Sequence, residues 1–213
     1  MGICPPFATN MEHVFITHGH LDHIAAIPVH AQQRTFLYMP TPTYHVSPSI
    51  LPKLDHILKG FQSIDPTRLK YTLRPVDTKE IKLPNGVIVR PFQTRHRVES
   101  QGFSFWKITS TLKDEFKGLG SEAIREKIKE GVEVKETTES LEIVVTGDTT
   151  IDGLMETPWC FDAKVLITEC TYADDDNPPS LSKERGHMHL DDLAQNAALF
   201  KNEHIILMVC TSP

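Results

Sequence analysis

The sequence predicts a protein of strands and helices packed in layers, an α/β or α+β sandwich. Three observations support this prediction: short apolar runs rich in β-branched and aromatic residues recur along the chain, amphipathic segments fall between them, and no regular strand–helix–strand rhythm is present. The chain has 213 residues, of which 39% are hydrophobic and 23% charged. That length and composition are typical of one globular domain with its own core.

Each element expected in the first part of the chain has a local reason. Residues 12–17 (EHVFIT) are short, β-branched and aromatic, as a buried strand is, and they run directly into a histidine cluster. Residues 21–33 place apolar side chains at near-helical spacing. A short strand is expected at 36–39, ended by a proline-rich loop, and an amphipathic helix at 50–61.

Strands are predicted in the middle of the chain, and both strands and helices in its last part. Strands are expected at 69–73, 78–83, 87–94 and 102–110, with a Pro-Asn-Gly hairpin turn at 84–86. A charged segment with a helix at 122–129 follows. The remaining expected elements are strands at 142–146, 164–168 and 205–209, a polar loop at 174–185 and a helix at 190–200.

The charge balance argues against a surface covered with nucleic-acid-binding charge, because the formal net charge is −6. An RNA partner would have to be held locally, where bound metal reverses part of the acidic field. No apolar run reaches the length of a membrane span, and the first residues contain no secretory signal. The four cysteines are far apart and form no CxxC pair, which favours a reducing compartment. We expect the cytoplasm or the nucleus, with an organelle left open.

Three histidines and one aspartate fall within six residues directly after the first expected strand: His18, His20, Asp22 and His23. A loop that leaves a strand end can point alternate side chains at one spot. His18 and His20 could then ligate one metal ion, and Asp22 and His23 a neighbouring one. Neutral imidazole and carboxylate suit zinc or manganese. The alternative is a solvated turn that happens to be rich in histidine, and it fits this spacing poorly.

Two later residues could complete such a site, and each follows an expected strand. His96 lies in the segment TRHR and Asp148 in TGDT. The glycine before the aspartate lets the backbone turn close to a metal ion. An aspartate between two cations would be the shared ligand of a two-metal pair. Either residue alone would be interpreted as an ordinary loop residue, but together with the histidine cluster both are expected to be ligands.

These motifs, in this order, resemble the metallo-β-lactamase superfamily and, within it, the short form of ribonuclease Z, the endonuclease that removes the 3′ trailer from precursor tRNA. The similar stretches are VFITHGHLDHIAAIP, TRHRVESQGF, TGDT with the later VLITECTY, and GHMHLDDLAQNA. The resemblance covers most of the chain. It implies an α+β fold, a four-layer αββα sandwich, over residues 1–213, together with two zinc ions (manganese or another divalent ion being the alternative) and a homodimer.

The resemblance also implies a role for each ligand. One zinc ion would be held by His18, His20 and His96, the other by Asp22 and His23, with Asp148 shared between them. Asp22 would in addition orient or deprotonate the attacking water. Metal-bound water has a pKa of about 7, so hydroxide would be available as the nucleophile at neutral pH.

A departing 3′-oxygen needs a proton donor that titrates near pH 7, and histidine is the natural choice. From the residues alone, His187 and His189 are equal candidates, and either could be an ordinary loop histidine. The resemblance selects His187 as the acid and Glu169 as the carboxylate that orients it. His13, His30, His45, His56 and His204 are expected to be structural, as are Trp106 and Trp159.

The sequence departs from the family pattern in two places. The family has several strands ahead of the histidine loop, whereas here only a short segment precedes it, so we expect an incomplete N-terminal sheet. The family closes the second metal site with a histidine after the last strand. Here that position is Val209, and Cys210 is one residue out of register. We therefore expect a truncated form of a longer protein, with a weakened second metal site and little activity.

Residues 111–140 form a charged insertion in the interval where the family places its tRNA-contacting arm. The basic side chains that could contact phosphates there are Lys113, Lys117, Arg125, Lys127 and Lys129. On the sequence alone we favour a simpler interpretation, a solvated helix with interleaved glutamates and lysines. Two alternatives to the implied endoribonuclease also stay open: a hydrolase of the same superfamily that acts on a thioester or a cyclic phosphodiester, and a metal-poor remnant without activity.

Overall fold

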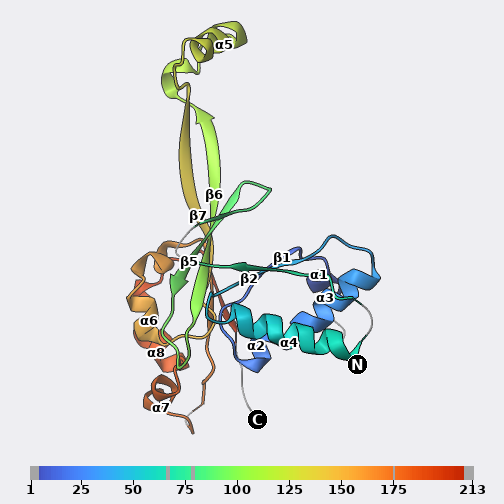
Figure 1. The fold of residues 1–213 in the computed structure, drawn as a ribbon. Helices are drawn as coiled ribbons and strands as arrows, with labels where there is room; N and C mark the ends of the chain where they lie inside the picture. Colours follow the sequence, from blue (N-terminus) through green and yellow to red (C-terminus); the bar gives the residue numbers. More distant parts are fainter. Residues whose placement is uncertain (1–4, 66–67, 78–79, 175, 209–213) are drawn as a thin grey trace.

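The computed structural model describes residues 5–65, 68–77, 80–174 and 176–208, which form two β-sheets with helices on their outer faces (Figure 1). Within these ranges, one sheet is parallel, in the order β1–β2–β3, and the other has six strands in the order β4–β5–β6–β7–β8–β9. The larger sheet is antiparallel from β4 to β7 and parallel from β7 to β9. The strands are β1 (His13–Phe15), β2 (Thr43–Val46), β3 (Thr72–Pro75), β4 (Ile81–Lys82), β5 (Val87–Gln93), β6 (Gln101–Leu112), β7 (Lys135–Val145), β8 (Val165–Glu169) and β9 (His204–Met208).

Three clusters of buried side chains show how the layers stack. Tyr44 of β2 packs with apolar residues of α3 and α4 on the small sheet. Leu166 of β8 packs with apolar residues of α6 and α8 on the large sheet. Phe15 of β1 lies 5.1 Å from Phe103 of β6, ring centre to ring centre, so the two sheets face each other. These contacts confirm the predicted αββα sandwich. The helices are α1 (Pro6–Thr9), α2 (Leu21–Ile24), α3 (Ile27–Phe36), α4 (Leu51–Ile64), α5 (Ser121–Lys129), α6 (Ile151–Met155), α7 (Pro179–Glu184) and α8 (Leu190–Gln195), with 3-10 turns η1 (Asp114–Phe116), η2 (Pro158–Asp162) and η3 (Ala197–Leu199).

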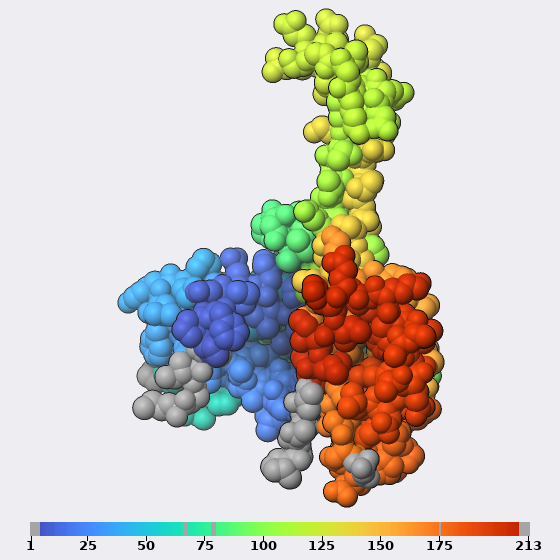
Figure 2. Space-filling model, turned by 180° about the vertical axis from the view of Figure 1, so that it is seen from behind, coloured from blue at the N-terminus to red at the C-terminus, as the bar shows by residue number. Residues whose placement is uncertain are grey.

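The charged insertion is a long arm that stands out from the sandwich (Figures 1 and 2). Strands β6 and β7 pair from Phe103↔Val145 to Leu112↔Lys135 and carry η1 and α5 at their far end. The helix was predicted at 122–129 and lies at Ser121–Lys129. The strand predicted at 142–146 begins seven residues earlier, at Lys135. Residues 135–139 are exposed on both faces, so no apolar alternation marks this part of the strand.

One predicted strand was wrong. Phe36 ends α3, and Tyr38 has a φ of +54°, so residues 36–39 form a helix end and a turn. The buried guanidinium of Arg34 fixes this turn by donating hydrogen bonds to the carbonyl oxygens of Thr9 (2.7 Å) and Pro40 (2.8 Å). The strand lies instead at β2, inside the segment predicted to be a proline-rich loop.

Three helices were not predicted: α1, α6 and α7, the last of which forms within the predicted polar loop. The helix predicted at 21–33 is divided into α2 and α3, and the strand predicted at 69–73 lies at Thr72–Pro75. Strand β1 is an edge of the small sheet in the described part of the chain. None of the helices in these ranges is both long enough and apolar enough to cross a lipid bilayer. The ends of β1, β5, β7 and β8 point toward one end of the sandwich, where the predicted ligands lie.

Candidate metal centre

The structure brings the predicted ligands together from loops at the ends of four elements. The loop after β1 carries two of the histidines, the first turn of α2 carries the next Asp-His pair, and the loops after β5 and β7 carry the last two ligands. The residues are His18, His20, Asp22, His23, His96 and Asp148. A β-bridge between His18 and Ser100 holds the first loop against the start of β6. The centre is therefore assembled from both sheets.

Three imidazoles and one carboxylate converge at one point, which we call the first metal position. His20 Nδ1 lies 3.1 Å from His18 Nε2 and 3.2 Å from His96 Nε2. Asp148 Oδ2 lies 3.5 Å from His18 Nε2 and 3.9 Å from His96 Nε2. Ligand atoms at about 2.1 Å from a tetrahedral zinc ion are about 3.4 Å apart. The spacing and the donor types therefore fit one zinc ion held by four ligands.

The candidate second metal position lies at the same oxygen of Asp148, Oδ2, on the side of His23. His23 Nε2 lies 3.4 Å from Asp148 Oδ2 and 3.3 Å from Asp22 Oδ2, the same spacing as at the first position. The side chain of Asp22 is 73% exposed, whereas that of Asp148 is 13% exposed. This half of the centre faces solvent, as a position that takes water and substrate must. Val209 and Cys210 lie outside the described residues.

The first-position histidines are oriented from behind. Thr17 Oγ1 lies 3.1 Å from His18 Nδ1, and the carbonyl oxygen of Gly186 accepts from His96 Nδ1 at 2.7 Å. Such partners on the far ring nitrogen fix the tautomer and turn Nε2 toward the metal. Gly186 has a φ of +79°, and a Cβ there would lie 2.9 Å from His96 Nδ1. The contact therefore requires glycine at this position.

The backbone also needs glycine before the shared aspartate, as the sequence predicted. Gly147 has a φ of +63°, and a Cβ at this residue would lie 2.7 Å from the side chain of Thr17. Such a backbone conformation is strained for other residues. The close approach presses the Asp148 loop against the histidine loop, so the ligands from the two sheets reach one another.

Burial and neighbouring charges set the protonation of these ligands. It lowers the pKa of His18 to about 4, helped by the neighbouring His23, and it also lowers the pKa of His96. Burial raises the pKa of Asp148, but the hydrogen bond and positive charge of His23 outweigh it, and the pKa falls below its usual value. Neutral imidazole and ionised carboxylate are the forms that bind a metal, so His18, His96 and Asp148 are held in those forms. The hydrogen bond with Asp148 instead raises the pKa of His23, which would release its proton on binding a metal.

A buried carboxylate and a histidine lie beside the shared aspartate. Both carboxylate oxygens of Glu169 lie 3.0 Å from His187 Nδ1, and the backbone N–H of Thr149 donates to Glu169 Oε1 at 2.6 Å. Burial lowers the pKa of His187, but the hydrogen bond and charge of Glu169 and the charge of Asp148 outweigh it, and the pKa is raised. His187 can therefore carry a proton near neutral pH.

His187 and its neighbour His189 have different surroundings, which distinguishes their roles. His189 Nδ1 accepts a hydrogen bond from the backbone of Asp191 at the start of α8, and its Nε2 lies 3.1 Å from the carbonyl oxygen of Asp174. Both ring nitrogens of His189 are thus used in the fold, whereas His187 faces Asp148 across 3.9 Å. Of the two candidates, His187 is the one that lies at the centre.

Comparison with known proteins agrees with this geometry. A family model described as the beta-lactamase superfamily domain matches residues 4–208. A tRNase Z of Arabidopsis thaliana is 30% identical over 211 residues, which cover 98% of this chain and 75% of the relative. The chain belongs to the tRNase Z family. A chloroplastic tRNase Z of the same plant is 33% identical over 97% of this chain, and the chain spans 59% of that relative's length.

The fold of the tRNase Z family is also seen in a solved structure. The crystal structure of human tRNase Z, short form, matches with a TM-score of 0.62 and covers 96% of this chain and 74% of that chain. The sequences are 19% identical, so this likeness concerns the fold.

Sequence reasoning missed several residues that support the site of this tRNase Z family member. Thr171 Oγ1 donates a short hydrogen bond to Glu169 and lies 3.3 Å from His187 Nδ1. Thr17 and Gly186 orient the histidine ligands, as described above. The position of Thr171, two residues after Glu169, was one signal in the sequence. Thr17 directly precedes His18, whereas the contact of Gly186 with His96 joins segments far apart in the chain.

The histidines predicted to be structural take part in other contacts. His30 lies 2.7 Å from Tyr44 Oη and 3.1 Å from the carbonyl oxygen of Ala8. His13 Nδ1 lies 3.1 Å from His45 Nε2, and Phe15 stacks on His45 with ring centres 4.5 Å apart. Among the described residues, none of these joins a cluster of three or more potential ligands.

Proposed function

We propose that the chain is a zinc-dependent endoribonuclease that removes the 3′ trailer of precursor tRNA. The observation that carries this proposal is the proton donor beside the two-metal ligand set: His187, paired with Glu169, lies 3.9 Å from the shared Asp148. Cleavage of a phosphodiester needs a nucleophile on one side of phosphorus and a proton for the leaving oxygen on the other. Membership of the tRNase Z family supports precursor tRNA as the substrate.

The side chains divide this work between them. When bound, two zinc ions would bring the pKa of a water molecule to about 7 and neutralise charge on the phosphate. Asp22, the one exposed side chain among the six candidate ligands, orients the attacking water and takes its proton. Because Nδ1 of His187 faces Glu169, its Nε2 is the atom that delivers a proton to the leaving 3′-oxygen. Glu169 keeps the imidazole charged and fixed in place.

The arm supports a large RNA substrate. Strand β6 begins beside His18 and runs for twelve residues to the arm's far end. At about 3.3 Å per residue, the tip stands about 35 Å or more from the centre. A molecule that touches both must be long and folded, which a thioester or a cyclic nucleotide is not. Lys117 and Lys127 pair with Asp114 and Glu130, so we propose Lys113, Arg125 and Lys129 as phosphate contacts.

A cleavage assay on precursor tRNA, with metal content measured on the same sample, tests the proposal. A thioester and a cyclic nucleotide run in parallel as alternative substrates. We expect cleavage at the 3′ end of the tRNA body, loss of cleavage after chelation and return with zinc or manganese. Turnover of the thioester or the cyclic nucleotide with intact precursor tRNA would assign a different hydrolase. We also propose a homodimer in the cytoplasm or nucleus, and sedimentation of the chain measures its oligomeric state.

A further inference from the structure

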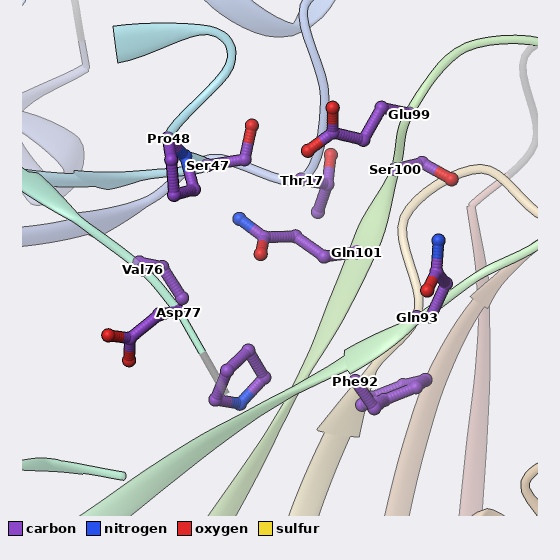
Figure 3. A pocket seen from close by; sticks show the side chains of 11 residues that line it. Thr17, Ser47, Pro48, Val76, Asp77, Phe92, Gln93, Glu99, Ser100 and Gln101 are labelled. Atoms are coloured by element: carbon purple, nitrogen blue, oxygen red, sulfur yellow. The ribbon is translucent and has the colours of Figure 1, made fainter. Parts of the chain in front are cut away.

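A cavity of about 350 Å³ lies beside the metal centre, in the seam between the two sheets (Figure 3). Its walls come from the loop after β2, the end of β3, the end of β5 and the start of β6. Two of its residues belong to the frame of the centre. Thr17 precedes His18 and contacts its Nδ1, and Ser100 forms the bridge to His18. The cavity therefore adjoins His18 on its Nδ1 side, behind the nitrogen that faces the other ligands.

The cavity combines apolar walls with a polar rim. Pro48, Val76 and Pro91 contribute apolar surface, and Glu99, Gln93 and Gln101 contribute hydrogen-bonding groups. Figure 3 shows the amide of Gln101 reaching into the space toward Ser47, and Glu99 extending over Thr17. Apolar walls with a few polar groups at the edge, in a volume of this size, are typical of sites for small organic molecules.

The polar rim is rich in free acceptors. Among the described residues, the side chains of Glu99 and Gln93 have no hydrogen-bond or ion-pair partner. Gln101 Nε2 donates to the carbonyl oxygen of Ile16 at 2.9 Å, which leaves its own carbonyl oxygen for a ligand. A carboxylate accepts hydrogen bonds and donates none when ionised. The rim therefore matches a ring that presents N–H groups at its edge.

We propose that this cavity binds one splayed nucleobase of the RNA, the base of a nucleotide near the bond being cut, with Glu99 accepting from its amino and imino groups. The inference rests on the proposed function. Bases of single-stranded RNA are recognised in this way, through their flat faces and their Watson–Crick edges. Guanine fits best because N1–H and the N2 amino group lie side by side opposite one carboxylate. Uracil fits worst because carbonyl oxygens flank its N3–H and face the negative charge.

Nucleosides test the cavity without involving the metal centre, because they carry no phosphate. Guanosine, adenosine, cytidine and uridine are titrated into the whole chain, and binding is followed by saturation-transfer NMR. We expect guanosine to bind at least about fivefold more tightly than uridine. Glu99→Gln replaces one acceptor with a donor and should bring that ratio close to one. The matched control is Glu203→Gln, an exposed glutamate next to β9, which should keep the wild-type ratio.

Cleavage gives a second readout. Precursor tRNAs that differ only in the base beside the cleavage point are compared by kcat/KM, and Glu99→Gln should change their order. Gln93→Leu provides a second variant, with circular dichroism to confirm that each variant folds. Equal binding of the four nucleosides, or an unchanged order in folded Glu99→Gln, would overturn the proposal. Failure of the proposed function has a different signature, namely that the wild-type chain cuts none of the precursors.

Discussion

His45 should make the stability of the fold depend on pH between 7.5 and 5. Its side chain is fully buried between the sheets, stacked on Phe15 and 3.1 Å from His13. Burial, with smaller contributions from the charges of His13 and Arg74, lowers its pKa from 6.5 to about 4. The unfolded chain then binds a proton in a pH range where the folded chain does not. Stability is complete above pH 6.5 and is lost as the pH falls toward 4.

The size of the effect follows from these two pKa values. Integrating the proton linkage from pH 7.5 to pH 5 gives a loss of about 2 kcal/mol in the free energy of unfolding. Urea unfolding at both pH values measures it, with a chelator present so that metal binding does not contribute. His45→Phe keeps a flat ring against Phe15 and removes the titrating group. Its own loss between the two pH values should be smaller than that of the wild type by about 2 kcal/mol.

The matched control is the exposed His56, whose replacement by glutamine should leave the pH dependence as in the wild type. Other buried histidines titrate in the same range, so the difference between His45→Phe and the wild type is the decisive quantity. If the two proteins lose the same free energy between pH 7.5 and pH 5, burial of His45 does not suppress its protonation and the reasoning is wrong.

Three further outcomes are expected. His187→Ala should lower precursor tRNA cleavage by about 10²- to 10⁴-fold with unchanged metal content; a matching loss of metal would instead make His187 a ligand. Arg34→Met leaves the carbonyl oxygens of Thr9, Met11 and Pro40 without their donors, and urea unfolding should show a loss of about 2–4 kcal/mol; a loss below 1 kcal/mol would mean that water replaces the guanidinium. Val209→His should raise the metal content per chain, and two equivalents in the wild type would contradict the predicted weak second site.

The convergence of the six histidine and aspartate side chains could be predicted from the sequence because all lie in segments that follow strands β1, β5 and β7 and because metal chemistry restricts the residue types. The residues that orient these ligands could not be predicted. Gly186 orients His96 across ninety positions of sequence, and Thr17 meets Gly147 only because two sheets pack together. Nothing in the sequence around Gly186 or Gly147 indicates such a partner.

The strand errors have a different cause. Strand β2 contains only four residues between proline-rich flanks, and its burial comes from packing against α3 and α4. The outer half of β7 has no apolar face, since residues 135–139 are exposed. Its extended conformation comes from hydrogen bonding to β6, a contact that a hydrophobic pattern does not record. The periodicity of hydrophobic residues therefore predicted most strands that form the core, but it underestimated the length of the strand β7 in the arm.

The metal centre and the packing of the two sheets are one thermodynamic unit. His18, His20 and His23 belong to the half of the chain built on the small sheet, whereas His96 and Asp148 follow strands of the large one. An ion held by both sets cannot bind unless the sheets are in register, so its binding free energy stabilises their contact. At a free metal concentration a thousand times the dissociation constant, that amounts to about 4 kcal/mol. The same coupling means that a substitution in the interface between the sheets, at Phe15 or Phe103, should weaken metal binding without touching a ligand.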